Sequence, residues 1–494
     1  MSEFRKLARH TSHFFTSRVM LMLIGFVSFP LFTRVMSVAD YGLLNLAQRV
    51  VLFVTAIAKL GLQQSMLRFG GEAGEDPAKC RRIYSTFFLL AALACVTIIP
   101  LYELIVGVVW RTGGLSDGTA MPLLAAGCLV VPRVAGAPFV GMLRLEEKTK
   151  TLSLLEVAQR ALSVLLAAGA LLFIARTPSM FLLAAGIAEG SILLLALGRL
   201  VPPGRISFGS FDLPTARDAL AFGGPLIIYE MLSILLGAID RPFIQAMLGS
   251  EPLGYYAAAS GLAVFAQELT QTPLNLALLP ICLRLWREEG LEATSRFLNR
   301  ILIYAAAGMV MVILVSAVCS REIIVVLGSQ KYEGAHGLLA PLMLAVMMFA
   351  SITILNIGPL ITKKTLGMSW YLFWSVVVKL ALLLLLLRPM GLYGAVISTI
   401  MGFGMMLVFL VRASRECIAI RFPASAAAGI ACAALGAAAV GFSLPELPLP
   451  LATLVFQGGA VVTVYTGLVC LSVAEFRPWP ARLIAAARER LSGK

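Results

Sequence analysis

The hydrophobic positions of this chain gather in fourteen long runs that short polar segments separate. A helix that crosses a bilayer needs about 20 mostly apolar residues, within a range of about 17–25. Each run is long enough, so the pattern predicts fourteen membrane-spanning helices. The predicted spans are residues 14–36, 42–65, 83–108, 120–143, 152–175, 179–199, 218–247, 255–281, 300–319, 335–360, 366–387, 391–412, 424–443 and 450–473.

The cationic residues fall mainly in alternate segments between these runs. With the N-terminus in the cytoplasm, the cytoplasmic segments hold 27 of the 40 Lys and Arg residues and the outer segments hold 6. Cytoplasmic loops of membrane proteins carry such an excess of positive charge. An odd number of spans would invert half of the segments and destroy the bias. We therefore expect a multi-pass protein with both termini in the cytoplasm.

The chain also shows an internal repeat. A shift of 212 positions places Gly42 on Gly254 and Phe53 on Phe265, and internal repeats are common in transporters. We expect two six-helix lobes around a central cavity, followed by two additional helices and a basic cytoplasmic tail. The expected parts are residues 1–200, 201–413 and 414–494.

The composition excludes a water-soluble protein. Hydrophobic residues make up 59% of the chain and charged residues 13%, whereas soluble domains contain about 45–50% and about 25%. A formal charge of +14 would suggest nucleic-acid binding in a soluble protein, but the loop bias explains it here. We expect an all-α membrane protein whose partners include membrane lipids and no nucleic acid.

No motif for catalysis or metal binding stands in the sequence. The eight Cys residues show no metal-ligand spacing, and we interpret them as small buried apolar residues. Phosphate loops, HExxH and catalytic-triad patterns are also missing from it. We expect a transporter rather than an enzyme, with no metal and no cofactor. Its energy would come from an H⁺ or Na⁺ gradient, the membrane potential or the substrate concentration.

Charged residues within the predicted spans are the candidates for function. A charge near the bilayer centre costs about 2.5–3.5 kcal/mol on insertion scales, so such residues face the bundle interior or an aqueous cavity. The cations are Arg18, Arg49, Lys59, Arg133, Arg160, Arg241 and Lys379, and the acids are Glu156, Glu189, Glu230, Asp240 and Glu268.

The second span carries a polar stripe, and its counterpart in the repeat carries another. The stripe recurs at intervals of three and four, which places it on one helix face. Its members are Asn45, Gln48, Arg49, Leu52, Thr55, Lys59 and Gln63. The counterpart consists of Ser260, Gln267, Gln271 and Asn275, with Glu268 beside them. These stripes predict a central cavity lined by cations and amides, and Arg18 on the first span would join it.

Structural roles stand beside these functional ones. Glu156 and Arg160 are four residues apart and could pair along one helix, and Asp240 and Arg241 could form a structural clamp. Lys59 and Arg18 could extend to the membrane surface. Glu230 and Glu268 could couple transport to an ion, or they could serve as partners for the cations.

The chain resembles the polysaccharide-biosynthesis flippases in five stretches that follow the order of that family. The stretches are FVSFPLFTRVMSVADYGLLNLAQ at 26–48, RLEEKTKTLSLLEVAQRALSVLL from Arg144, VVLGSQKYEGAHGLLAPLMLA from Val325, ITKKTLGMSWYLFWSVVVKLALLLLL from Ile361 and GLYGAVISTIMGFGMML from Gly391. The family belongs to the multidrug/oligosaccharidyl-lipid/polysaccharide exporter superfamily.

The resemblance implies a flippase of the cytoplasmic (inner) membrane that works by alternating access. Its substrate would be an undecaprenyl-diphosphate-linked oligosaccharide for O-antigen, capsule or exopolysaccharide synthesis. A polysaccharide polymerase and a chain-length regulator are the protein partners that such a role suggests. Family members use cationic cavity residues, and by position Arg18, Arg49 and Lys59 match them in the first lobe and Arg241 in the second.

The chemistry of such a substrate divides the candidates into two groups. Arg and Lys offset a diphosphate, and Arg binds it through bidentate contacts. The diphosphate candidates are Arg18, Arg49, Lys59, Arg133 and Arg241. Sugar hydroxyls need amide partners, and the glycan candidates are Gln48, Gln63, Gln267, Gln271 and Asn275.

Three other functions remain open from the sequence. A multidrug/cation antiporter of the same superfamily would need an anionic pocket, which Glu230 and Glu268 could supply. A peptidoglycan-precursor flippase would share the cationic cavity. A non-transporting scaffold of a polysaccharide assembly complex would tolerate Arg49→Ala and Arg133→Ala.

Overall fold

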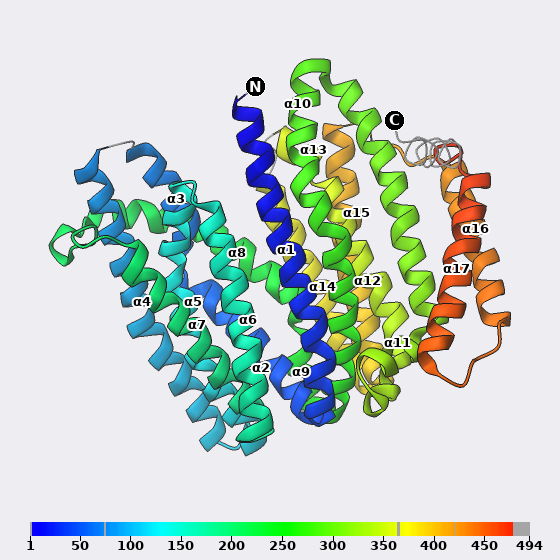
Figure 1. The fold of residues 1–494 in the computed structure, drawn as a ribbon, viewed down its shortest axis with the longest axis horizontal. Helices are drawn as coiled ribbons and strands as arrows, with labels where there is room; N and C mark the ends of the chain where they lie inside the picture. Colours follow the sequence, from blue (N-terminus) through cyan, green and yellow to red (C-terminus); the bar gives the residue numbers. More distant parts are fainter. Residues whose placement is uncertain (1, 74–75, 363–365, 419, 478–494) are drawn as a thin grey trace, which may run out of the picture. The chain divides into compact units, whose positions relative to one another are not determined.

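The structure is a computed structural model that describes residues 2–73, 76–362, 366–418 and 420–477. These residues form α-helices and two short 3₁₀ helices and contain no strand (Figure 1), which confirms the all-α prediction. The first unit contains α1 Ser2–Val35, α2 Val38–Ala58, α3 Leu62–Ala73, α4 Pro77–Arg111, α5 Asp117–Leu145, α6 Thr149–Phe173, α7 Pro178–Leu200, η1 Phe208–Ser210, α8 Leu213–Ala238, α9 Asp240–Leu248 and the start of α10 Ser250–Val318. The second contains the rest of α10, α11 Ser320–Leu327, η2 Gln330–Ala335, α12 His336–Leu355, α13 Ile357–Ile361, α14 Leu366–Met390, α15 Leu392–Cys417, α16 Ala424–Ser443 and α17 Pro450–Ser472.

Thirteen helical runs in the described residues are long and apolar enough to cross a membrane. One of them, α10, contains two of the fourteen predicted spans, and only Gly290 interrupts it, with a φ of 83°. Large apolar side chains such as Phe173 and Leu194 stay exposed on the outer faces of these helices. Exposed apolar area on this scale fits contact with lipid rather than with water. The chain is therefore a multi-pass membrane protein.

Three predicted element boundaries differ from the structure. The polar segment 282–299 was expected to be a loop, but it is helical on both sides of Gly290. The span 42–65 is two helices, because the backbone turns at Leu60 and Gly61, where both φ angles are positive. The span 218–247 likewise breaks after Ala238. Hydropathy identifies membrane segments, but it does not show where a helix bends or continues into water.

The 212-residue repeat is visible in the order of the helices. Adding 212 to the first residue of α2 gives Ser250, where α10 begins. The same shift carries α7 onto α15. α1 corresponds to α8 and α9, which meet where the predicted seventh span breaks. The repeat inferred from a few residues therefore holds for whole elements.

The chain divides by packing into two compact units, Met1–Ala257 and Ala258–Lys494. The expected lobe boundaries at residues 200 and 413 remain predictions. In the first unit, α5 is the central helix: it packs against α2, α3, α4 and α7, and three prolines lie inside it. α8 packs on α2, α3 and α4, so the seventh predicted span belongs with the first six in this unit.

Two glycines related by the repeat touch each other at the first turns of α2 and α10. A Cβ on Gly42 would lie 2.6 Å from the amide nitrogen of Gly254 and 2.7 Å from the carbonyl oxygen of Ser250. A Cβ on Gly254 would in turn meet the backbone of Val38, which is the repeat counterpart of Ser250. The two helices therefore approach each other backbone to backbone, with reciprocal contacts.

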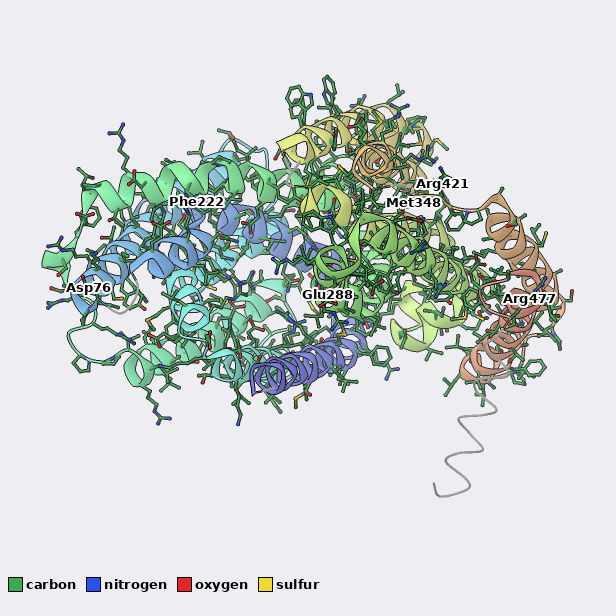
Figure 2. All side chains as sticks on the ribbon, turned by 90° about the horizontal axis from the view of Figure 1, so that it is seen from above. Asp76, Phe222, Glu288, Met348, Arg421 and Arg477 are labelled. Carbon is green, nitrogen blue, oxygen red and sulfur yellow. The ribbon has the colours of Figure 1, made fainter. Side chains whose placement is uncertain are left out.

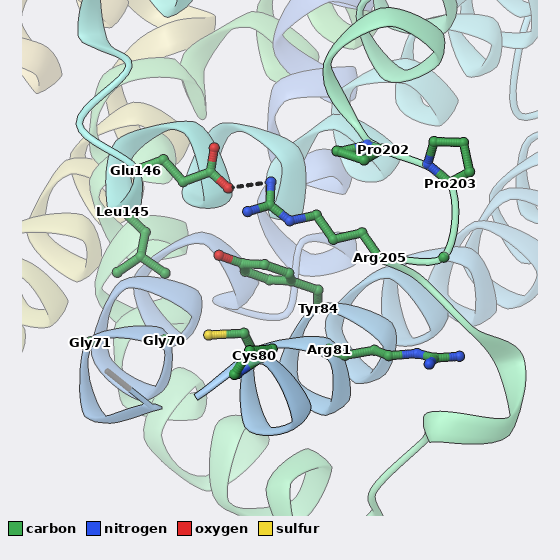
Figure 3. Close-up of a pocket in the computed structure, with 12 residues that line it drawn as sticks. Gly70, Gly71, Cys80, Arg81, Tyr84, Leu145, Glu146, Pro202, Pro203 and Arg205 are labelled. Carbon is green, nitrogen blue, oxygen red and sulfur yellow. Dashed lines mark ion pairs between the residues drawn. The ribbon is translucent and has the colours of Figure 1, made fainter. Parts of the chain in front are cut away.

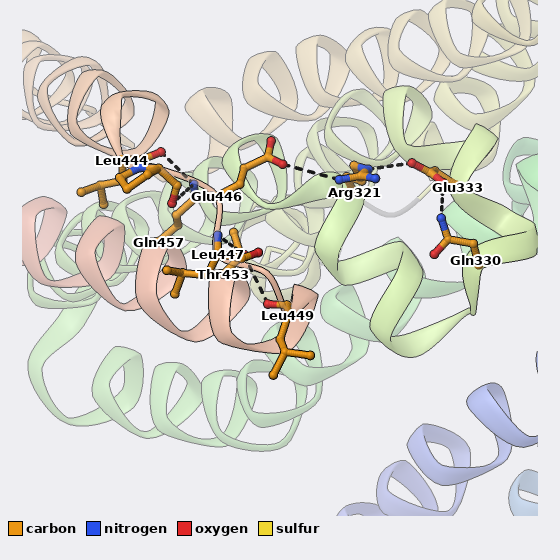
Figure 4. Close-up of polar contacts among 10 residues, drawn as sticks. Arg321, Gln330, Glu333, Leu444, Glu446, Leu447, Leu449, Thr453 and Gln457 are labelled. Carbon is orange, nitrogen blue, oxygen red and sulfur yellow. Dashed lines mark hydrogen bonds and ion pairs between the residues drawn. The ribbon is translucent and has the colours of Figure 1, made fainter.

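In the second unit, α16 and α17 pack on the C-terminal half of α10 through an apolar cluster that includes Ile303, Ala437 and Val461. The connection between the two helices is fixed by polar contacts (Figure 4). Arg321 at α11 pairs with Glu333 at 2.6 Å and with Glu446 at 3.5 Å. The additional helix pair is thus held to this unit by apolar contacts along the helices and by charge at one end.

Candidate functional site

A cavity of about 170 Å³ lies within the first unit, between the α2–α3 break, α5, α6 and α7. Its polar lining consists of Lys59, Gln63, Arg133, Glu156, Gln159 and Glu189. Three of these residues, Lys59, Gln63 and Arg133, are sequence candidates. Charged side chains in a membrane bundle are costly unless they face such a cavity or pair with each other.

The strongest interaction in the cavity joins α5 to α7. Arg133 Nε donates to Glu189 Oε2 at 2.8 Å, and Nη2 donates to Oε1 at 2.7 Å. The side chain of Arg133 is 30% exposed and that of Glu189 is 10% exposed. A bidentate pair fixes the plane of the guanidinium as well as its charge. One side of Arg133 is therefore held by carboxylate while part of the side chain remains accessible.

Local backbone geometry presents Lys59 to the cavity. Lys59 is the residue that ends α2, and the turn at Leu60 and Gly61 redirects the chain into α3. Gly61 also sits against Gly223 of α8, where a Cβ would lie 2.7 Å from the neighbouring Cα, so only glycine fits both its φ and its packing.

Arg18 reaches the same cluster from α1. Its Nη2 lies 3.6 Å from Glu156 Oε2, and Glu156 lines the cavity. The Glu156–Arg160 pairing that the sequence suggested stays a prediction, since Glu156 here has Arg18 as a partner. The structure thus gathers Arg18, Lys59 and Arg133 around one site.

The sequence stripe predicted a lining of cations and amides, but carboxylates balance those cations. Lys59 and Arg133 line the cavity together with Glu156 and Glu189, so the charges of the lining cancel. The physical reason is the cost of an uncompensated charge at low dielectric. The sequence contains a signal for this pairing, because Arg133 and Glu189 are opposite charges that stand alone in two separate apolar spans. Our interpretation of the α2 stripe did not use it.

A second charged cluster surrounds Arg241 and lies away from the cavity lining. Arg241 is only 2% exposed and Asp240 1%. Arg241 Nε donates to Asn45 Oδ1 at 2.6 Å, and Nη1 lies 3.2 Å from Asp240 Oδ1. Tyr256 donates its hydroxyl to Asp240 and places its ring beside the guanidinium. This geometry is that of the structural clamp, with no exposed face for a substrate.

The remaining candidates occupy other positions. Gln48 and Arg49 are half-buried on α2, between Asn45 and Lys59. In the second unit, Gln267 donates to Gln271 at 2.8 Å, and Gln271 donates to Thr353 at 2.7 Å. Asn275 and Glu268 are exposed on the same helix.

A larger hollow of about 770 Å³ lies in the first unit, at helix ends predicted to be cytoplasmic. Arg205 from the segment between α7 and α8 pairs with Glu146 at 2.6 Å and lies over the ring of Tyr84 (Figure 3). Ser85 and Thr86, both buried, accept hydrogen bonds from the backbone of the same segment. These contacts hold the connection between α7 and α8 against α4.

Comparison with known proteins identifies the kind of fold. The family model described as polysaccharide biosynthesis protein matches residues 7–286. No curated protein matches the chain. Among solved structures, the lipid II flippase MurJ in an inward closed conformation aligns with a TM-score of 0.74 at 13% identity, over 94% of this chain and 98% of that one.

Multidrug transporters align over a smaller part of the chain. A multidrug resistance MATE family transporter of the MOP superfamily, in an inward-facing conformation, has a TM-score of 0.58 at 15% identity, covering 80% of this chain and 94% of that one. A mutant of the MATE transporter VcmN from Vibrio cholerae has a TM-score of 0.53 at 13% identity, covering 83% and 96%. At these identities the likeness shows a shared fold, that of MurJ and the MATE transporters.

Proposed function

Because the chain belongs to the polysaccharide biosynthesis protein family, we propose that it flips an undecaprenyl-diphosphate-linked oligosaccharide across the cytoplasmic membrane. The oligosaccharide would pass from the inner to the outer leaflet by alternating access and would serve O-antigen, capsule or exopolysaccharide synthesis. The fold shared with a lipid flippase supports transport of a lipid-linked substrate. The charge bias of the loops supports cytoplasmic termini.

The observation that carries this proposal is the charged cavity of the first unit. It holds Arg133 and Lys59 between membrane-spanning helices, where a diphosphate would otherwise find no partner. The cavity has a volume of about 170 Å³, whereas pockets that enclose drug-sized ligands have volumes of about 300–1,000 Å³. It therefore suits an anionic headgroup, and the glycan would lie outside it.

The carboxylates give the cavity an exchange mechanism. Without substrate, Glu189 keeps Arg133 paired in a medium of low dielectric. An entering diphosphate would compete with Glu189 for the guanidinium and with Glu156 for its cationic neighbours. The displaced carboxylates would then carry uncompensated charge, and uptake of H⁺ or Na⁺ would relieve it. We extend the ion-coupling proposal for Glu230 and Glu268 to these two acids.

The remaining candidates complete the proposal. Gln63 lies in the cavity lining and could bind a hydroxyl next to the diphosphate. Gln48, Gln267, Gln271 and Asn275 stay proposed contacts for the glycan. Arg18 and Arg49 stay proposed contacts for the diphosphate. Arg241 is the weakest candidate because its guanidinium is buried among protein groups.

Variants that keep the charge balance of the cavity test this assignment. We expect the double variant Arg133→Gln/Glu189→Gln to slow flipping of a lipid-linked oligosaccharide in reconstituted vesicles by at least about tenfold, since charge-assisted hydrogen bonds are worth about 1.5–3 kcal/mol. Arg111→Gln, on the exposed end of α4, is the matched control. Normal flipping by the double variant would overturn the role of Arg133, whereas the absence of flipping by the unmodified protein in the same vesicles would support a scaffold instead.

A cation antiporter is the second candidate, because Glu156 and Glu189 line the same cavity and MATE transporters share the fold. Glu189→Gln separates the two functions. An antiporter would lose binding of a cationic drug, whereas a flippase would keep diphosphate binding or strengthen it. A peptidoglycan-precursor flippase would behave like the proposed one in this test, and the accumulating lipid-linked glycan in a deletion strain distinguishes the two.

A further inference from the structure

Two arginines flank a hollow at the junction of α15 and α16, in the second unit. The hollow has a volume of about 690 Å³ and is lined by Arg415, Ile420, Arg421, Phe422 and Pro423. Both arginines are exposed. Within the described part of the chain, no carboxylate lies at ion-pair distance from either guanidinium. The hollow therefore offers two uncompensated positive charges.

Described residues on both sides of position 419 are held by contacts with the protein. The amide of Arg421 donates to Asn299 Oδ1 of α10 at 2.9 Å. Ile418 and Ile420 anchor the connection, since their side chains are 1% and 7% exposed. The contact with α10 thus holds the backbone at Arg421, which is one of the labelled side chains in Figure 2.

The lining combines charge with apolar surface. Phe422 is 38% exposed beside Arg421, and the connection joins the ends of two helices that are apolar enough to span a membrane. A group that satisfies both features has an anionic head and an apolar body. Basic hollows between membrane helices on the cytoplasmic side bind the headgroups of anionic lipids.

We propose that this hollow binds the phosphate headgroup of an anionic phospholipid, with Arg415 and Arg421 on the phosphate and Phe422 against the glycerol and acyl chains. The site is separate from the cavity of the first unit, and it does not depend on the proposed transport function. The bound lipid would fill the junction where the additional helix pair α16–α17 leaves α15.

The test measures lipid retention by the full-length protein in nanodiscs. Discs of phosphatidylcholine containing a limiting fraction of phosphatidylglycerol are followed by native mass spectrometry of the released complex. Arg415→Gln/Arg421→Gln should weaken phosphatidylglycerol binding by about 25-fold, at about fivefold for each arginine near the surface. Arg284→Gln/Arg287→Gln is the control, because it removes the same charge from exposed positions of α10 in the same unit.

The two double variants distinguish specific binding of the lipid in the hollow from a general attraction of anionic lipid to surface arginines. Equal losses in the two double variants, or no loss in either, would overturn the proposal. Phe422→Ala leaves the charge unchanged and should also weaken retention of the lipid. Displacement of the lipid by millimolar inorganic phosphate alone would mean that the hollow binds free phosphate, and it would overturn the assignment to a lipid. Size-exclusion profiles of all variants check that the fold is kept.

Discussion

Two clusters of the first unit contain a membrane-embedded arginine next to a carboxylate, yet their surroundings differ. Arg241 is 2% exposed and is enclosed by Asp240, Asn45 and Tyr256. Arg133 is 30% exposed and borders a cavity. The same pair of residue types therefore forms a buried structural clamp in one place and an accessible charged site in the other. Burial, rather than residue type, distinguishes them.

The largest expected effect is at the buried cluster around Arg241. Asp240→Asn should lower the free energy of unfolding by about 3–5 kcal/mol, because it removes the carboxylate that lies beside a buried guanidinium. The measurement is denaturant unfolding in detergent micelles. The double variant Asp240→Leu/Arg241→Met should recover most of that loss. A change below about 1 kcal/mol in Asp240→Asn would mean that water reaches Arg241 and that the two clusters do not differ.

The next effect concerns the packing at the first turns of α2 and α10. Gly42→Ala should cost about 1–3 kcal/mol, because the added Cβ would overlap the backbone of α10. Gly25→Ala is the control, since nothing lies within 4 Å of its Cβ position and alanine favours a helix by up to about 1 kcal/mol. Equal thermal midpoints for the two variants would contradict the close contact.

In the cavity, one substitution is expected to lower stability and to strengthen ligand binding, and both effects are smaller than those above. Glu189→Gln should lower stability by about 1–2 kcal/mol, because Arg133 loses a charged hydrogen bond but stays partly hydrated. The same change should strengthen binding of a diphosphate, since a competitor for the guanidinium is removed. Isothermal titration of a soluble prenyl diphosphate analogue checks the sign. Weaker binding would place the diphosphate elsewhere.

The smallest effect lies outside both clusters. Asp212 caps α8: it accepts from the Thr215 amide at 3.0 Å and from the Thr215 hydroxyl. The hydrogen bond from the Thr215 hydroxyl lowers the pKa of the Asp212 carboxyl below its usual 3.8, and the hydrogen bond from the Thr215 amide lowers it further by a smaller amount. The cap should therefore stabilise the fold at neutral pH and lose its contribution as pH falls through that lowered pKa. Asp212→Asn should cost about 1 kcal/mol or less and remove this dependence from acid unfolding curves.

Much of the fold could be predicted because membrane helices need long apolar runs, and the fourteen runs correspond to helices in the structure. The segment around Gly290 was missed for a physical reason. It is rich in Arg, Glu and Leu, which favour helix as well as solubility, so polarity indicated a loop where the chain stays helical. Breaks such as Gly61 depend on packing against a distant glycine.

The site was predicted only in part. The spacing of Lys59 and Gln63 on the α2 stripe predicted two members of the cavity lining. The partner of Arg133 lies 56 residues away in the chain, and no spacing rule brings two separate helices together. Arg133 and Arg241 also look alike in sequence, because exposure depends on neighbours from several helices.

The contact between Gly42 and Gly254 has a consequence for how the chain can change. The two positions are copies of each other under the repeat, and each meets the other's helix in the same way. Each of the two positions packs against the helix that carries the other, so a larger side chain at either one would clash at the same contact. Glycine avoids that clash at no steric cost, and a larger residue at either position would push the two helices apart.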